Sequence, residues 1–280
     1  MSAGRVKIGI EGLDDMLGGG LIPLNICAII GTYGTGKTTF ALHFVWEGLQ
    51  RMENILYISL EERGDRILTY MKQKKMYDVD RFNYKSLDPS LKSTKNSQPA
   101  QGADTGHDQT IHPGAHPNPP AQDAKTSSPQ KPTLVILKLD PTDFSLANNQ
   151  IKREIPKLIR EVNASRVVID PISLFEDLFD NDSERRQEMF RYVEGLREQK
   201  CTIMLTSETH QNYPYSSRHG LIEYLSDTVI LLRYIRPSDL TDVHLALEVV
   251  KMRESAHSRE IKPYEIKQDQ VVVYSEANVF

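Results

Sequence analysis

The stretch Gly31-Thr32-Tyr33-Gly34-Thr35-Gly36-Lys37-Thr38 decides the fold of this chain. It fits the pattern G-x-x-x-x-G-K-[ST] at every fixed position. The preceding residues 26–30 are a short apolar run of the kind that a buried parallel strand needs. Downstream, apolar residues recur at helical spacing, namely Phe40, Ala41, Phe44, Val45 and Leu49. A strand, a glycine-rich turn and a helix therefore follow one another in the order that this motif requires.

The residue types of this loop suit the binding of nucleotide phosphates. Glycines let the backbone curl so that successive N–H groups point inward and form a nest for anionic oxygens. The helix start behind the nest adds unpaired N–H donors and a partial positive charge. Lys37 can reach the terminal phosphates, and the Thr38 hydroxyl can bind Mg²⁺. The predicted nucleotide-binding residues are Gly34, Thr35, Gly36, Lys37, Thr38 and Thr39.

Composition argues against several classes of protein. The 280 residues carry 34 basic and 38 acidic side chains, a net charge of −4, which gives no overall electrostatic case for a nucleic-acid or membrane partner. Cys27 and Cys201 lie in apolar runs, which predicts two buried free thiols. No apolar run approaches eighteen residues and the N-terminus lacks a signal-type apolar core, so we expect a soluble, cytoplasmic protein.

Predicted strands and helices alternate through most of the chain. Strands are expected at residues 55–60, 134–137, 166–170 and 201–206, and helices within 8–24, at 65–75, at 143–162 and at 183–199. Pro156 should kink or split its helix, and Ser183 is the expected N-cap. Four further strands without helices between them are expected at residues 228–234, 243–252, 261–266 and 271–274. This pattern predicts one α/β domain over residues 1–280, a mainly parallel sheet flanked by helices with a C-terminal antiparallel extension.

Residues 88–132 differ from the rest of the chain. They contain eight of the fifteen prolines, no aromatic residue, and Leu91 and Ile111 as the large aliphatic residues. Such a segment buries too little apolar surface to offset its ordering entropy, which predicts a disordered insertion in a surface loop. Three histidines in it suggest a metal site, but they lack cysteine or carboxylate partners in a fixed scaffold, so we do not favour one.

Carboxylates follow three of the predicted strands. Asp170 ends the strand 166–170 at the carboxyl edge of the sheet, where it can hold Mg²⁺ together with Thr38. Glu61 and Glu62 end the second strand at the same edge, and only one of them can face the phosphates because adjacent strand residues point to opposite faces. A carboxylate there could orient and deprotonate the attacking water. Glu208 is a further candidate, for sensing the phosphate state.

These pieces together resemble the KaiC family of RecA-like P-loop ATPases, over nearly the whole chain outside residues 88–132. The matching pieces are residues 12–14 and 18–21, the loop 31–38, Glu61-Glu62, and residues 167–170, 206–208 and 224–227. The stretch Lys251-Met252-Arg253-Glu254-Ser255-Ala256-His257 is similar to the family's K-x-R-x-[ST]-x-H hairpin.

The resemblance implies roles for individual residues. It implies that ATP and Mg²⁺ are the cofactors and that Glu61, with Glu62 beside it, supplies the general base. It also implies that Lys251 and Arg253 reach across a subunit boundary to the neighbour's ATP, with Ser255 and His257 close by. A homo-oligomeric ring follows from a head-to-tail contact that closes, and the resemblance implies the family's usual state, a hexamer.

The chain departs from the family pattern at two places. Glu223 and Tyr224 stand where the second domain of the family's clock member has a Ser-Thr pair that accepts phosphate, so this autophosphorylation should be absent here. Pro171 follows Asp170 where a small hydroxyl residue is usual, which affects the expected loop geometry.

The sequence is compatible with three candidate functions. The leading hypothesis is a ring-forming regulatory ATPase whose nucleotide state changes the surface offered to an unidentified protein partner. The alternative is a RecA/RadA-type DNA-handling ATPase, for which residues 209–225 offer Tyr213, Tyr215 and His219 for base stacking but Arg218 as their one firm cation. A non-hydrolysing nucleotide-binding scaffold is less favoured because Lys37, Glu61 and Asp170 occur together. No membrane partner is expected.

Overall fold

A single mixed sheet of ten strands organises the computed structural model, which describes residues 4–75, 77–88, 131–141, 150–210, 212–235 and 243–277. The strands are β1 (Ile26–Gly31), β2 (Ile55–Ser59), β3 (Asn83–Leu87), β4 (Thr133–Lys138), β5 (Arg166–Asp170), β6 (Thr202–Glu208), β7 (Thr228–Ile235), β8 (His244–Met252), β9 (Lys262–Ile266) and β10 (Val271–Val273). Their order across the sheet is β10-β9-β8-β7-β1-β6-β5-β2-β4-β3. The strands from β7 to β3 are parallel, and β8, β9 and β10 extend the sheet in antiparallel pairs.

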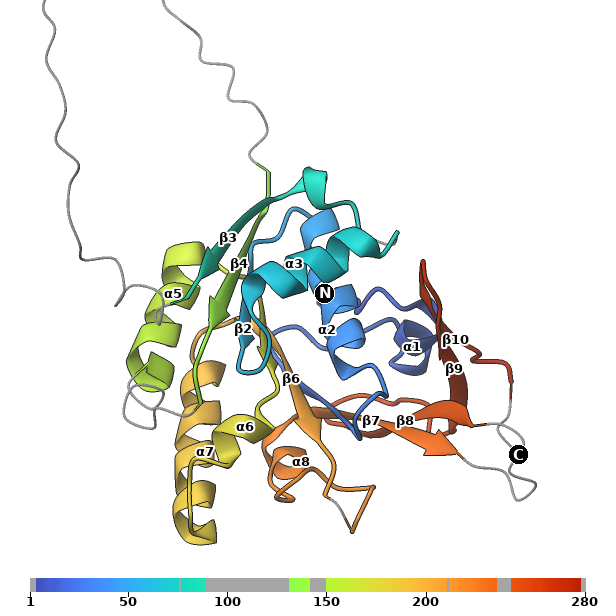
Figure 1. The fold of residues 1–280 in the computed structure, drawn as a ribbon. Helices are drawn as coiled ribbons and strands as arrows, with labels where there is room; N and C mark the ends of the chain where they lie inside the picture. Colours follow the sequence, from blue (N-terminus) through green and yellow to red (C-terminus); the bar gives the residue numbers. More distant parts are fainter. Residues whose placement is uncertain are drawn as a thin grey trace, which may run out of the picture.

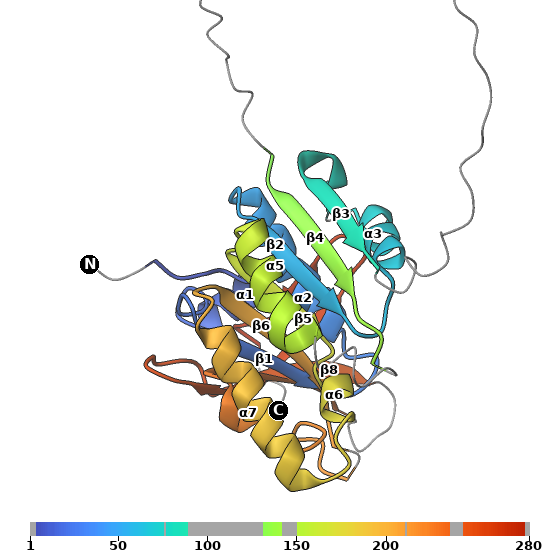
Figure 2. The ribbon, with the colours of Figure 1, turned by 90° about the vertical axis from the view of Figure 1, so that its left-hand side faces the viewer.

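Helices cover both faces of this sheet. They are α1 (Glu11–Met16), α2 (Lys37–Gln50), α3 (Gly64–Gln73), α5 (Ile155–Val162), α6 (Ser173–Glu176), α7 (Asp182–Arg197) and α8 (Ile222–Leu225), with shorter turns η1 (Val79–Arg81) and η3 (Gln150–Glu154). Figure 1 shows α2 and α3 on one side of the strands, with β9 and β10 at the far end of the sheet from β3. Figure 2 views the opposite face, which α5 and α7 cover. The predicted α/β architecture, mainly parallel with a C-terminal antiparallel extension, is confirmed.

Two apolar cores form because residues alternate between the faces of each strand. In β1, Cys27 and Ile29 join the core under α1, α2 and α3, whereas Ile26, Ala28 and Ile30 join the core under α5, α6 and α7. Both cysteines are buried and free, as predicted. In the described part of the chain, no helix combines the length and apolarity needed to cross a bilayer.

Several local predictions about helices and strands need correction, and one prediction falls on residues that the structure does not describe. The sequence did not predict β3, an exposed edge strand with a mostly polar sequence. The N-cap of α7 is Asn181, whose side chain accepts a hydrogen bond from the Glu184 N–H, rather than Ser183. Pro156 sits in the first turn of α5, directly after the π-helical turn η3, so the expected helix is split there. Residues 89–130, and with them nearly all of the expected insertion and its three histidines, lie outside the described residues.

Candidate nucleotide-phosphate site

The loop between β1 and α2 has the conformation that its glycines predict. Gly34 and Gly36 have φ of 75° and 88°, and Gly36 is the residue before the first turn of α2. A side chain at either position would collide with its surroundings, at Gly34 with the Tyr234 hydroxyl and at Gly36 with the Ile266 side chain. Thr35 is fully buried, and its hydroxyl donates to the Thr32 carbonyl at 2.7 Å, which closes the loop.

Lys37 lies back on this loop. Its Nζ donates to the carbonyls of Gly31 at 2.9 Å and Thr32 at 3.2 Å. Burial lowers the pKa of Lys37, and three nearby carboxylates oppose that shift, namely those of Glu208, Asp170 and Glu61. Three acidic side chains that act on one lysine are the electrostatic signature of a site in which added cations would be stabilised.

Asp170 is the centre of a hydrogen-bonded cluster behind the loop. Its carboxylate accepts from Thr38 Oγ1 at 2.9 Å, from the Tyr57 hydroxyl at 2.5 Å, and from Thr206 Oγ1. Burial and the Asp170 charge raise the pKa of Tyr57 well above its usual range, so its hydroxyl remains a donor. The peptide bond from Asp170 to Pro171 is cis, and the carboxylate reaches Thr38 all the same.

Sequence reasoning assigned no role to Tyr57 or Thr206. Both lie inside strands adjacent to β5, in β2 and β6, and reach Asp170 from either side. Their signal in the sequence was weak, because nothing in the local pattern of β2 or β6 sets either hydroxyl apart from the other polar groups of those strands, such as Ser59 and Ser207.

The two glutamates lie in the turn after β2, which ends at Ser59, so strand alternation does not determine their directions and local contacts do. The Ser59 hydroxyl accepts from the Glu62 N–H at 3.0 Å and donates to the Glu62 carbonyl at 2.6 Å, which fixes the turn. The Glu62 carboxylate lies 3.6 Å from Nη1 of Arg66 on α3. The pKa of Glu61 is raised by partial burial and then by Asp170, Glu208 and Glu62, while Lys37 lowers it. Glu61 is therefore the one of the pair that interacts with both Lys37 and Asp170.

Glu208 ends β6 directly beside Gly31 and is held by an arginine. Arg218 Nη1 lies 2.7 Å from the Glu208 carboxylate, and Arg218 Nε lies 3.1 Å from that of Asp177. His219 Nε2 lies 2.8 Å from the same Asp177 oxygen. The loop after β6 is thus tied by ion pairs to the end of α6.

Thr39 differs from its neighbours in the loop. Its side chain is buried and lies 3.0 Å from the Tyr70 hydroxyl of α3. The side chain therefore braces α2 against α3, which leaves its backbone N–H, at the helix start, as the group available to a phosphate.

The hairpin that carries Lys251 and Arg253 lies beside the amino ends of β7 and β1, whereas the phosphate loop follows the carboxyl end of β1. Lys251 Nζ donates to the carbonyls of Glu223 at 2.8 Å and Ser226 at 2.6 Å. Arg253 contacts the Asp227 carboxylate at 3.4 Å and the Tyr224 carbonyl at 3.1 Å. Ser255 Oγ accepts from Arg5 Nη2 at 2.6 Å, and His257 Nδ1 lies 2.8 Å from the Ser258 carbonyl. The chain does not bring these four residues to its own phosphate loop.

The residues present fit a magnesium-bound nucleoside triphosphate. The backbone cradle excludes side chains at Gly34 and Gly36, and Lys37 lies on the loop itself. Thr38 and Asp170 place a hydroxyl and a carboxylate within 2.9 Å, and such hard oxygen donors are the ligands that Mg²⁺ prefers.

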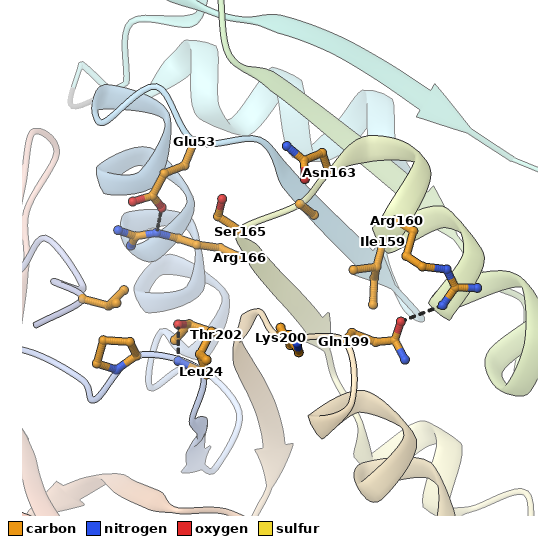
Figure 3. A pocket seen from close by; sticks show the side chains of 13 residues that line it. Leu24, Glu53, Ile159, Arg160, Asn163, Ser165, Arg166, Gln199, Lys200 and Thr202 are labelled. Carbon is orange, nitrogen blue, oxygen red and sulfur yellow. Dashed lines mark hydrogen bonds and ion pairs between the residues drawn. The ribbon is translucent and has the colours of Figure 1, made fainter. Parts of the chain in front are cut away.

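A cavity of about 520 Å³ lies at the opposite edge of the sheet, where β5 and β6 begin (Figure 3). Arg160 and Gln199, joined at 2.8 Å, form part of its wall, and Arg166 pairs with Glu53 on another side. Asp170 and Glu208 are at the far ends of these two strands, so this cavity is separate from the phosphate loop.

Comparison with known proteins points to one family. The family model for the ATPase KaiC matches residues 6–101 and 134–278. The circadian clock oscillator protein KaiC of Prochlorococcus marinus subsp. pastoris is 27% identical over 98% of this chain and 46% of its own length. This chain spans about half the length of the clock proteins that it matches.

Two relatives are similar along their whole length. A UPF0273 protein of Thermotoga maritima is 28% identical, with 96% of each chain covered. The crystal structure of a KaiC-like protein from Pyrococcus horikoshii superposes with a TM-score of 0.67 at 24% identity, covering 96% of this chain and 98% of that one. The latter likeness establishes the RecA-type fold.

Proposed function

Because the chain belongs to the KaiC ATPase family, we propose that it binds Mg-ATP on the loop of residues 31–38 and hydrolyses its terminal phosphate. The observation that carries this proposal is the convergence of Lys37, Thr38 and Asp170, with the Glu61 carboxylate acting on both charged groups. A phosphate cradle, a pair of Mg²⁺ ligands and a candidate base are the parts that phosphoryl transfer to water needs.

Each residue has a distinct task in this proposal. Lys37 leaves the carbonyls of Gly31 and Thr32 and binds the terminal phosphates, because a phosphate oxygen is the stronger acceptor. Thr38 and Asp170 hold Mg²⁺, which supplies charge neutralisation at the phosphates when bound. Glu61 orients the attacking water and accepts its proton.

The charge balance of the site suggests that a neighbouring copy takes part. Acidic side chains outnumber basic ones around the loop, because the carboxylates of Glu61, Asp170 and Glu208 act on the single Lys37. Arg218 adds no free positive charge, since it is paired with Glu208 and Asp177. The transition state adds further negative charge that one lysine does not neutralise. We infer that Lys251 and Arg253 of an adjacent subunit, flanked there by Ser255 and His257, supply the missing cations.

A head-to-tail contact of this kind forms a ring when its rotation closes, and we propose a closed hexamer. Hydrolysis then depends on assembly, so the nucleotide state can change the surface that the ring offers to a protein partner. We propose this regulatory role, in a soluble cytoplasmic protein, as the function of the chain.

The DNA-handling alternative receives less support. Arg218, the cation that residues 209–225 offered to a phosphate backbone, is held by two carboxylates. Tyr213 and Tyr215 are well exposed, but Arg233, stacked on Tyr215, is paired with Glu248 at 2.8 Å. Binding of single-stranded DNA rests on phosphate neutralisation as well as stacking. Retention of single-stranded DNA on filters, weakened by added salt, would revive this function.

Phosphate release from ATP tests the proposed activity. Wild-type protein should release phosphate in the presence of Mg²⁺. Lys37→Ala should lose nucleotide binding, whereas Glu61→Gln should bind ATP and cleave it at least about 100-fold more slowly, the size expected for loss of a general base. Glu62→Gln is the matched control, because that carboxylate lies toward Arg66, and it should retain most activity.

The outcomes separate the alternatives. Wild-type turnover in Glu61→Gln would remove that residue as the base. ATP binding without phosphate release by wild-type protein, at concentrations that permit assembly, would favour the non-hydrolysing scaffold.

A further inference from the structure

Side chains from β7 and from the antiparallel extension beside it cover the phosphate loop. Strands β7 and β9 direct Tyr234, Tyr264 and Ile266 at the loop, and these side chains contact loop residues between Tyr33 and Gly36. No part of the P-loop motif itself requires such a cover, because the nest is made by the loop's own backbone.

Tyr264 makes the most buried of these contacts. Its hydroxyl donates to the Thr35 carbonyl at 2.6 Å, and its ring packs edge-on against Phe40 of α2 with centroids 5.3 Å apart. Burial raises the pKa of Tyr264, so the hydroxyl stays protonated and remains a donor. Tyr264 is paired with Leu245 in the middle of the extension, which fixes its backbone.

Tyr234 and Ile266 act on either side of this contact. The Tyr234 hydroxyl donates to the Tyr33 carbonyl at 3.2 Å and occupies the space where a side chain of Gly34 would lie. The Ile266 side chain occupies the corresponding space at Gly36. The carbonyls of Tyr33 and Thr35 are thus held toward β7 and β9.

We propose that Tyr264, assisted by Tyr234, is a positioning residue for ATP, since it holds loop carbonyls outward so that the loop N–H groups converge on the phosphates. This inference rests on the proposed function of the loop and adds a residue set to it. It assigns a role to the C-terminal strands, whose residues lie more than 200 positions from the loop in sequence.

Tyr264→Phe is the test, since it removes one hydroxyl and leaves the ring against Phe40. ATP affinity is measured by calorimetric titration at 25 °C, with KM and kcat from phosphate release. We expect ATP binding and KM to weaken by about tenfold, or about 1.4 kcal/mol, the size of one hydrogen bond whose loss leaves a buried carbonyl unpaired. The turnover number should stay within about twofold, because Glu61 and Asp170 are untouched.

Tyr77→Phe is the matched control. Tyr77 is also buried on this face of the sheet, but its hydroxyl has no hydrogen-bond partner among the described residues. Removal of the Tyr77 hydroxyl should leave ATP affinity unchanged. Urea unfolding without nucleotide, run on both variants, verifies that each is folded at 25 °C.

The outcomes test the positioning role of Tyr264 separately from the proposed ATPase function on which it rests. Unchanged ATP affinity in Tyr264→Phe, with wild-type protein binding ATP, would overturn the positioning role. Absence of ATP binding in wild-type protein would sink the proposed function instead. If Tyr264→Phe does not fold, Tyr234→Phe takes its place: a rise in KM at unchanged kcat supports the inference, and no change in KM overturns it.

Discussion

At Gly36, backbone conformation and surrounding space impose the same requirement. Its φ of 88° lies in the left-handed region, and the Ile266 side chain fills the position that a Cβ would take. We expect Gly36→Ala to weaken ATP binding by at least about tenfold, because the strain of about 1–2 kcal/mol is relieved by moving the loop. Titration with ATP measures this.

Gly195→Ala is the control for that substitution. Gly195 lies in α7 with a helical φ, and nothing lies within 4 Å of a Cβ added there. Alanine should raise the free energy of unfolding by about 0.5–1 kcal/mol through helix propensity and leave ATP binding unchanged. Equal ATP affinities for the two variants would show that the loop tolerates a side chain at Gly36.

The motif residues of the site were predictable because their spacing in sequence is short. Gly36, Lys37 and Thr38 belong to one turn, so the pattern alone fixed their arrangement. Tyr57 and Tyr264 were not predicted, because they reach the site from distant strands whose register only the folded sheet sets. A buried tyrosine in a strand is otherwise an ordinary core residue.

At the scale of elements, the short helix α6 carries a buried acid. Glu176 is fully buried, and neither carboxylate oxygen has a hydrogen-bond partner among the described residues. Burial, followed by the charges of Glu223 and Asp177, raises the pKa of Glu176 to about 8, against the lowering effect of Arg185 and Arg218. Glu176 is therefore protonated at neutral pH in the folded protein.

This acid predicts a pH-dependent stability. An unfolded glutamate titrates near 4.5, so the folded state binds the proton more tightly. Its contribution to stability is complete below that pH, is lost by roughly 1.4 kcal/mol per pH unit as the pH rises toward 8, and changes no further above it. Glu176→Gln, which has no charge to gain, should lack this component. Urea unfolding midpoints between pH 5 and pH 8.5 measure the difference, and parallel curves for the two proteins would rule it out.

Elements with a strong apolar pattern were predicted more reliably than those without one. The strands β1, β2 and β5 are buried along their length, as is β6 up to its last residue, and all four were predicted within two residues. The strand β3 was missed because, at an exposed edge, its backbone pairing with β4 places no demand on its side chains. At α7 the prediction of Ser183 missed a local signal, because Asn181 caps the helix through bonds to both the N–H and the carboxylate of Glu184, three residues later.

At the scale of the whole molecule, the charged residues of the proposed catalytic site form two groups. The phosphate-loop group and the pair Lys251 and Arg253 lie at opposite ends of the strands of one sheet. Met252 is paired with Thr228, which in turn is paired with Cys27 near the start of β1, whereas the phosphate loop follows Gly31 at the end of β1. At about 3.3 Å per residue the two positions are separated by roughly 13 Å along the strand. Lys251 and Arg253 therefore cannot serve the phosphate loop of their own chain without breaking the β7–β8 pairing.

This geometry makes a quantitative prediction for mixed assemblies. Arg253→Ala and Lys37→Ala should each turn over ATP slowly when alone, the former for lack of a cation from the neighbour and the latter for lack of a phosphate ligand. In an equal mixture that exchanges subunits, one contact in four joins an intact loop to an intact Arg253, so phosphate release should recover to about a quarter of the wild-type rate. Arg191→Ala, which removes an exposed arginine that pairs with Glu188 on α7, is the charge control and should be fully active alone.

The mixture is informative because each competing account gives a different number. If a single chain sufficed, Arg253→Ala alone would retain wild-type turnover and mixing it with Lys37→Ala would halve the rate. If Arg253 acted only through its contacts with Asp227 and Tyr224, its replacement would impair the chain that carries it, and mixing would restore nothing. Particle mass with and without ATP must accompany these rates, because rescue requires a particle larger than one chain. Recovery near one quarter in an assembled particle is the result that only a shared site produces.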